Sequence, residues 1–216
     1  MLRFLFPNKC VLCRKVLPDR QESLCENCRK QLPVFPGSKI NLSFLAQWTG
    51  LWYYKDDVRL SILRFKFSRQ SAYAKTFGKL LAQKLREDGW DQPEVLTWVP
   101  ISRRRKFRRG YDQTELLARV VAQELGIPLI PTLRKIRHIK PQSTLTTAAH
   151  RRANVLGVFR VIDSNAVWGR RILLLDDIVT TGATASECAK VLLSAGAKEV
   201  KLATLAVASH DKTSKR

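Results

Sequence analysis

Two adjacent acids followed by a threonine- and glycine-rich turn form the clearest chemical pattern in this sequence. They stand in the segment LLLDDIVTTGAT, residues 173–184. Asp176 and Asp177 follow an apolar run that predicts a buried strand, so we expect them at the carboxyl edge of an α/β sheet, where such sheets bind ligands. The turn comprises Thr180, Thr181, Gly182, Ala183 and Thr184. It precedes an expected helix over 185–195, and backbone N–H groups at a helix start bind anions. Carboxylates accept hydrogen bonds from sugar hydroxyls or bind a divalent cation, so the segment predicts a phosphorylated-sugar site. The alternative, an ordinary strand and helix, is disfavoured because adjacent acids are costly to desolvate.

Four cysteines near the N-terminus have the spacing of a metal site. Cys10, Cys13, Cys25 and Cys28 form two CxxC pairs separated by eleven residues. Four thiolates complete a tetrahedral Zn²⁺ shell with no open position, so we predict structural zinc. The metal would stabilise a head, residues 1–37, that is too small for a core of its own. Two disulfides are the alternative, disfavoured in the reducing cytoplasm that we expect in the absence of a recognisable export signal.

Positive charge is large and unevenly distributed. Lys and Arg number 39 against 18 Asp and Glu, a net charge of +21. Residues 101–171 hold 16 basic and 4 acidic side chains, whereas residues 172–216 hold 6 and 5. An anionic small ligand alone would need only a few of these cations. The excess therefore favours a polyanionic partner, and nucleic acid is the commonest one in a cytoplasm. No apolar run reaches the roughly 20 residues of a membrane span.

Two basic segments are expected near the sheet edge that holds the acids. The first follows a predicted strand over 94–100, and its cations are Arg103, Arg104, Arg105, Lys106, Arg108 and Arg109. Such a cluster repels itself unless an anion lies nearby, and Arg binds phosphate through paired contacts. The second, residues 134–154, predicts a long functional loop. A solvated basic face is the alternative for both segments.

Apolar patterning predicts alternating strands and helices over residues 38–208. Helices are expected over 60–67, 72–85, 113–125 and 185–195, and strands over 94–100, 129–133, 155–162, 172–175 and 200–207. This alternation predicts an α/β fold with a parallel sheet flanked by helices. The aromatic residues between Phe44 and Tyr54 are expected to pack the head on the body, with a base-stacking surface as the alternative. Residues 209–216 form a polar tail.

The segment 173–184 resembles the phosphoribosyl-pyrophosphate (PRPP) loop of type I phosphoribosyltransferases. Nearly the whole chain is similar to one branch of that superfamily, the ComF (ComFC-like) family, which is linked to DNA uptake in natural competence. The similarity rests on the four-cysteine head, on Lys66 in LRFKF, on Val99–Pro100 before the Arg-rich segment, and on the PRPP loop. It includes Arg109–Gln113, RGYDQ where the family usually has RGxNQ, so that Asp112 replaces a donor with an acceptor. It also includes Gln142, Arg151 and Arg152.

The resemblance implies a type I phosphoribosyltransferase-like fold and a set of roles. Asp176 and Asp177 would hold the ribose as catalytic residues, and the turn 180–184 would wrap the 5′-phosphate, with Mg²⁺ bound together with PRPP. The diphosphate or a nucleic acid would contact Lys66, Arg103, Arg104, Arg105, Lys106, Arg108, Arg109, Gln142, Arg151 and Arg152. Thr180 stands where purine-salvage enzymes have an acid, and a hydroxyl is no base at neutral pH, so purine salvage is disfavoured.

Three functions remain open from the sequence. The first is a protein that binds single-stranded DNA and PRPP and supports DNA uptake in natural transformation, with a DNA-uptake helicase as a candidate partner. The second is an active phosphoribosyltransferase that acts on a small amine or base. The third is a transcriptional regulator whose DNA binding is tuned by PRPP.

Overall fold

A parallel four-stranded sheet is the centre of the structure. The computed structural model describes residues 8–18, 23–37, 41–90, 93–137 and 153–208. The sheet has the order β1-β6-β5-β2, with β1 at Gln47–Tyr53, β6 at Glu199–Val207, β5 at Arg171–Val179 and β2 at Val95–Trp98. A separate antiparallel pair joins β3, Leu133–Lys135, to β4, Phe159–Val161.

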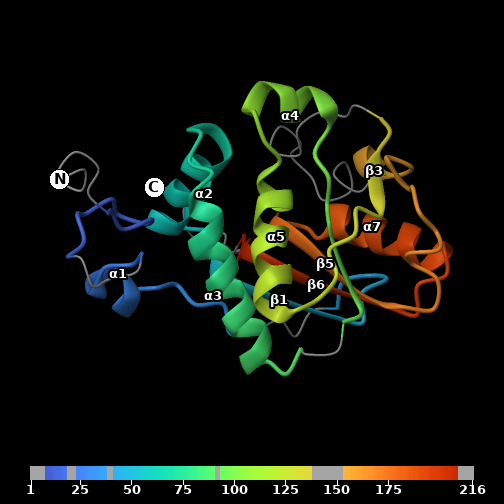
Figure 1. The fold of residues 1–216 in the computed structure, drawn as a ribbon, viewed down its shortest axis with the longest axis horizontal. Coiled ribbons are helices and arrows are strands. Elements are labelled where there is room, and N and C mark those ends of the chain that lie inside the picture. Colours follow the sequence, from blue (N-terminus) through green and yellow to red (C-terminus); the bar gives the residue numbers. More distant parts are fainter. Residues whose placement is uncertain (1–7, 19–22, 38–40, 91–92, 138–152, 209–216) are drawn as a thin grey trace.

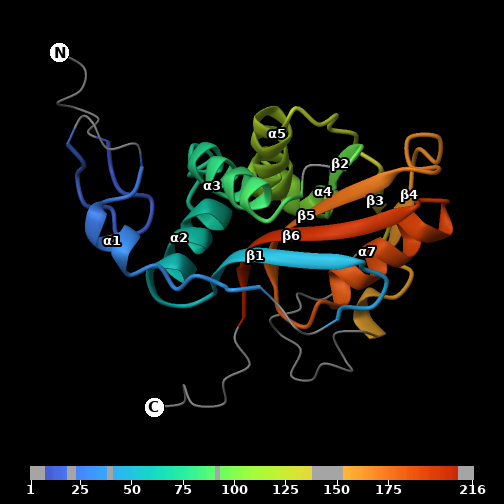
Figure 2. The same ribbon diagram turned by 90° about the horizontal axis from the view of Figure 1, so that it is seen from below.

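Helices cover both faces of the sheet (Figures 1 and 2). One face carries α2, Asp56–Phe67, α3, Tyr73–Glu87, and α5, Gln113–Leu125, and the other carries α7, Ala183–Ser194. The short helices are α1, Glu26–Lys30, in the N-terminal head and α4, Arg103–Arg109, at the top of Figure 1. No helix among the described ranges has the length and apolar content that a membrane crossing requires.

Strand β5 is buried on both faces because its side chains alternate between two apolar clusters. Leu173 and Leu175 pack on the side of α2, α3 and α5, whereas Ile172 and Leu174 pack on the side of α7. All four are at most 1% exposed. A continuous apolar run is typical of a central parallel strand, so the expected strand and the α/β class are confirmed.

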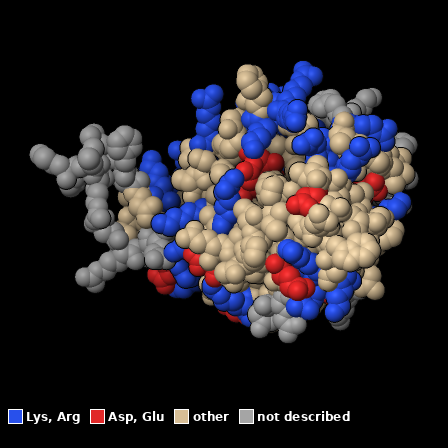
Figure 3. All heavy atoms as spheres, turned by 45° about the vertical axis from the view of Figure 1, so that its right-hand side comes forward, with Lys and Arg blue, Asp and Glu red and all other residues tan. Residues whose placement is uncertain are grey.

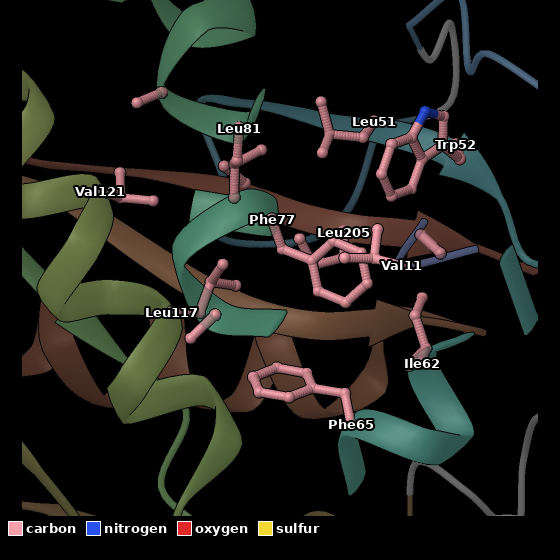
Figure 4. Close-up of a cluster of buried hydrophobic side chains, with 14 of the residues drawn as sticks. Val11, Leu51, Trp52, Ile62, Phe65, Phe77, Leu81, Leu117, Val121 and Leu205 are labelled. Carbon is pink, nitrogen blue, oxygen red and sulfur yellow. The ribbon is translucent and has the colours of Figure 1, made fainter. Parts of the chain in front are cut away.

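The first cluster is built around Phe77 of α3 (Figure 4). Its ring contacts Phe65 of α2 and Trp52 of β1, with centroids 5.7 and 5.9 Å away. Helices α3 and α5 approach closely at Gly78, where a Cβ atom would lie 2.5 Å from the Cβ of Val120. The absence of a side chain at Gly78 therefore sets the distance between these two helices.

The N-terminal head is fixed to α2 rather than tethered by a loose linker. Val11, between the first two cysteines, inserts beside Ile62 and belongs to the main apolar cluster (Figure 4). Ser61 and Arg64 of α2 donate hydrogen bonds to the carbonyl oxygen of Val11. The head and the body thus share one core.

Several expected elements differ from the structure. The aromatic segment contains strand β1, which the sequence analysis missed; its Trp52 is buried in the core, and Trp48 stacks on Phe35 of the connection from the head. Of the strand expected over 155–162, only β4 is formed. The expected segment begins at the end of a helical turn, residues 153–155. The segment expected as a strand over 129–133 joins the parallel sheet only through a bridge from Leu129 to Leu96 of β2. Its end, β3, pairs antiparallel with β4, so the strand expected over 155–162 does not extend the parallel sheet.

We expect Phe77→Ala to lower the free energy of unfolding by about 3–5 kcal/mol, because it leaves a large cavity among rigid aromatic rings. Denaturant unfolding followed by fluorescence measures the change. Phe107→Ala is the matched control, since that side chain is 93% exposed and its loss should change stability by less than about 0.5 kcal/mol. Equal effects of the two substitutions would contradict the position of Phe77 at the centre of the core.

Candidate functional site

A cavity of about 500 Å³ opens at the carboxyl edge of the sheet. Its walls come from the ends of β2 and β5, from α2, α4 and α5, from the start of α7, and from the β3–β4 pair. Among the predicted site residues, the cavity is lined by Lys66, Arg105, Arg108, Arg109, Asp176, Asp177, Thr180 and Thr184. Segments separated by more than a hundred residues therefore meet in one site.

The acids lie in this cavity because β5 is longer than its neighbour. Strand β2 ends at Trp98, and the N–H of Val99 donates the last hydrogen bond on that side to the carbonyl oxygen of Leu175. On its other side β5 stays paired with β6 as far as Val179. The expected end of β5 at Leu175 is thus too early, and Asp176 and Asp177 lie on the part of β5 that β2 leaves uncovered.

Asp177 is buried and held at both carboxylate oxygens. Lys66 Nζ lies 2.9 Å from Oδ1, and Gln113 Nε2 donates to Oδ2 at 2.7 Å. A buried carboxylate is stable only when it is paired and hydrogen-bonded, and both conditions are met here. Lys66, expected to contact phosphate or DNA, is therefore the counter-ion of Asp177 in this structure.

Among the described residues, Asp176 has no such cation at contact distance. Its Oδ1 accepts the backbone N–H of Asp177 at 2.8 Å. Desolvation and the negative charge of Asp177 raise the pKa of the Asp176 carboxyl to about 8. The two adjacent acids thus have different electrostatic environments, and near neutral pH the Asp176 carboxyl carries a proton.

The basic segment forms a helix, α4, rather than a loop. Ser102 caps its start by accepting the N–H of Arg105, and Gly110, with φ of 82°, ends it. Arg105, Arg108 and Arg109 line the cavity, whereas Arg103, Arg104 and Lys106 do not. Lys106 instead pairs with Glu115 at 2.7 Å.

Arg109 is the most constrained cation of this group. Its guanidinium lies 4.6 Å from the ring centre of Phe67 and donates to Gln113 Oε1 at 2.8 Å. Arg109 Nε is buried and has no hydrogen-bond partner among the described residues. Desolvation lowers the pKa of this guanidinium, which an anion in the cavity would counteract.

The turn between β5 and α7 divides into two parts. Thr180 and Thr184 line the cavity, whereas Thr181, Gly182 and Ala183 do not. Gly182 has φ of 73°, and a Cβ atom there would collide with the side chain of Leu42. Glycine is therefore required at this position by backbone conformation and by packing.

The contacts of Asp112 explain why this chain has aspartate where the family usually has asparagine. Its Oδ1 accepts the N–H groups of Thr114 and Glu115 at the start of α5, and its Oδ2 accepts the N–H of Ile101. Asparagine offers one acceptor oxygen, whereas aspartate offers two. The carboxylate thus joins the start of α5 to the end of β2.

Gln113 and Lys135 also line the cavity, and neither was predicted as a site residue. Gln113 belongs to the RGYDQ motif, so the resemblance offered a signal for it. Lys135 of β3 offered none, because its segment reads as an ordinary basic stretch. Burial and the positive charge of Arg105 lower the pKa of Lys135 to about 8, and its Nζ lies 5.4 Å from the ring centre of Phe159. Gln142, Arg151 and Arg152 lie outside the described residues.

The four cysteines of the head converge as their spacing predicts. The sulfur atoms of Cys10, Cys13, Cys25 and Cys28 all lie within 4.8 Å of one another, and none is in a disulfide. A tetrahedral zinc ion with bonds of about 2.3 Å holds its sulfurs about 3.8 Å apart, which this cluster fits. Helix α1 begins at this centre, where Cys25 accepts the N–H of Cys28. The four-sulfur donor set supports a structural zinc ion.

Comparison with known proteins agrees with both parts of the chain. A double zinc ribbon domain model matches residues 1–39, and a phosphoribosyl transferase domain model matches residues 113–216. Competence protein F of Haemophilus influenzae is 31% identical over 231 residues, which cover 95% of this chain and 99% of that protein. DNA utilization protein YhgH of Salmonella typhimurium is 31% identical, covering 89% and 87% of the two chains. Competence protein ComFC of Bacillus subtilis is 27% identical, covering 87% and 72%.

The similarity to competence protein F extends over almost the full length of both chains at more than 30% identity. The zinc ribbon match, the phosphoribosyl transferase match and the parallel sheet with its flanking helices occur in the same chain. The chain therefore belongs to the ComF family of type I phosphoribosyltransferase-like proteins.

Proposed function

We propose that this protein binds PRPP in the cavity and single-stranded DNA on its basic surface, and that it supports DNA uptake in natural transformation. The observation that carries the proposal is the cavity itself, in which two carboxylates on β5 face three arginines from α4. A ligand with sugar hydroxyls at one end and phosphates at the other matches this separation of charge. The relatives named as competence and DNA utilization proteins supply the DNA part of the proposal.

Different residues of the cavity would contact different parts of PRPP. Asp177, oriented by Lys66 and Gln113, accepts hydrogen bonds from the ribose, and Asp176 lies beside it. Arg105, Arg108 and Arg109 are placed for the diphosphate. Mg²⁺, when bound with PRPP, supplies further positive charge for the diphosphate, and carboxylate oxygens such as those of Asp176 suit it.

The domain boundaries, the cellular compartment and the protein partner belong to the same proposal. Residues 1–37 form the zinc head, residues 38–208 the phosphoribosyltransferase-like body and residues 209–216 a polar tail. The compartment is the cytoplasm, where thiols stay reduced and available to zinc. We include a DNA-uptake helicase as a protein partner, because a helicase produces the single-stranded DNA that this protein would bind.

An active phosphoribosyltransferase is the second candidate, favoured by the acidic pair at the carboxyl edge. In such a reaction the acids hold the ribose as positive charge develops on it, and the arginines stabilise the leaving diphosphate. Release of pyrophosphate from PRPP and Mg²⁺, measured with and without single-stranded DNA, separates a consumed substrate from a bound ligand. Preference for duplex over single-stranded DNA would instead favour the third candidate, a PRPP-tuned transcriptional regulator.

We expect the double substitution Asp176→Asn with Asp177→Asn to weaken PRPP binding by at least about 100-fold. A hydrogen bond to a charged group contributes about 1.5–3 kcal/mol, and two are changed. Titration calorimetry with Mg²⁺ and PRPP measures the loss. Zinc content should stay unchanged, and Asp57→Asn, at an exposed acid of α2, is the matched control. Unchanged affinity in the double variant would show that PRPP does not bind in this cavity.

The affinity for PRPP should pass through a maximum near pH 8. Asp176, whose pKa is raised to about 8, must lose its proton to act as a carboxylate, so binding strengthens as the pH rises toward 8. Lys135, whose pKa is lowered to about 8, loses its charge above that pH, so binding to phosphate then weakens. Calorimetry between about pH 6 and pH 9 measures the profile. Lys135→Met should abolish the decline at high pH, and a flat profile in the unsubstituted protein would refute both assignments.

Binding of single-stranded DNA should weaken steeply with salt, because cations of the protein displace counterions from phosphates. Each phosphate contact contributes about −0.7 to the slope of log K against log salt. Removing Arg103 and Arg104 together, by substitution with Ala, should make the slope less steep by about 1.4. Lys190→Ala, at an exposed cation of α7, is the matched control and should leave the slope unchanged. Equal binding at low and high salt would exclude a phosphate-driven interaction.

A further inference from the structure

Phe107 is the most exposed large apolar side chain among the described residues, at 93%. It stands in the middle of α4, whose sequence RRRKFRR contains no other apolar residue. No residue of α4 is fully buried, and the helix begins after the cap Ser102 and ends at Gly110. The ring of Phe107 therefore contributes nothing to a core. An aromatic residue at this position is accounted for by contact with a binding partner rather than by packing.

The side chains of α4 separate into two groups. Arg105, Arg108 and Arg109 line the cavity, and Phe107 does not. Arg103 and Arg104 precede Phe107 by four and three residues, so they share its side of the helix. These two arginines are exposed as well. The face of α4 turned away from the cavity thus presents one ring with two guanidinium groups one helical turn before it.

This face is electrostatically unfavourable without an anion. Cations at a helix start oppose the helix dipole, and the first turn of α4 contains no acid. Within the described part of the chain, Lys106 is the α4 cation that forms an ion pair, with Glu115. Figure 3 shows Lys and Arg side chains gathered along the upper edge of the molecule, where α4 lies, with carboxylates in the hollow below.

We propose that Phe107 is a base-stacking residue and that the outer face of α4 is a contact surface for single-stranded DNA. A single strand offers bases with free faces beside phosphates, which is the combination that a ring next to two arginines matches. In a duplex the bases are stacked inside, so their faces are closed to Phe107. This inference rests on the proposed binding of single-stranded DNA and adds the residue that distinguishes a single strand from a duplex.

The test uses the full chain and a fluorescent oligothymidylate of about 15 nucleotides, with anisotropy as the readout. Phe107→Ala should weaken binding by about 5- to 100-fold, the range found for loss of one base–aromatic contact. Phe107→Trp should retain affinity, and Phe107→Leu should lose it, because leucine keeps the apolar surface without the aromatic face. The salt slope should stay unchanged in all three variants, since none removes a charge.

Two controls show that the effect is specific. Trp168→Ala removes a side chain that is 73% exposed and precedes β5, at the opposite edge of the sheet from the acids, so affinity for the oligonucleotide should not change. PRPP affinity of Phe107→Ala should equal that of the unsubstituted protein, because Phe107 is not part of the cavity. A duplex of the same length should bind the Ala variant and the unsubstituted protein equally.

The outcomes separate this inference from the proposed function. If the unsubstituted protein binds the oligonucleotide and Phe107→Ala binds it equally well, base stacking by Phe107 is wrong while DNA binding stands. If Phe107→Leu keeps full affinity, the contact is apolar rather than aromatic and the inference is also overturned. If the unsubstituted protein does not bind the oligonucleotide at all, the proposed function itself fails. Binding of phosphatidylglycerol vesicles that depends on Phe107, without binding of the oligonucleotide, would assign the surface to a membrane and overturn the inference.

Discussion

The ion pair between Lys66 and Asp177 is the interaction on which the rest of the site depends. It joins α2 to β5 across 111 residues of sequence, at 2.9 Å, in a place where neither group is well hydrated. An unpaired carboxylate there would be costly, and Gln113 satisfies its second oxygen. The pair therefore aligns α2, β5 and the start of α5 around one cavity.

The surrounding residues follow from this constraint. Gln113 can donate to Asp177 because Arg109 holds the other end of its amide, and Arg109 is itself packed on Phe67. Asp112 anchors the start of α5 to the end of β2, which sets the position of Gln113. Asp176, next to an already paired carboxylate, keeps a raised pKa near 8 and is left to respond to a ligand. Asp177 thus helps to hold the elements of the site together, whereas Asp176 can change its charge near neutral pH.

Helix α4 connects the cavity with the outer surface. Its cations divide between the two sides, and among the described residues Lys106 is the α4 cation that forms an ion pair, with Glu115. An anion is therefore favoured in the cavity by Arg105, Arg108 and Arg109 and on the surface by Arg103 and Arg104. The zinc head contacts α2 at Ser61 and Arg64, and Val11 packs beside Ile62, so metal binding and the core are energetically linked.

Features that depend on neighbouring residues could be predicted from the amino-acid sequence alone. The CxxC pairs specify a four-thiolate centre, since ligand spacing depends only on two turns. The apolar run before Asp176 specifies a central strand, and Gly126 correctly ends the helix that begins at Gln113. Residue types that are adjacent in the chain were thus sufficient for the zinc centre, the α/β class and the acidic end of β5. They were not sufficient for β1, whose aromatic residues are also typical of a packing surface, or for the antiparallel pairing of β3 with β4.

The pairing of charged residues could not be predicted without the folded structure. Lys66, predicted to contact a phosphate, is the partner of Asp177, and Lys135 enters the cavity from a strand pair that no local pattern connects with it. The division of the α4 cations into a cavity side and an outer side likewise required the helix and its orientation. The physical reason is that Coulomb interactions and desolvation depend on distance and burial, and a sequence specifies neither for residues a hundred positions apart.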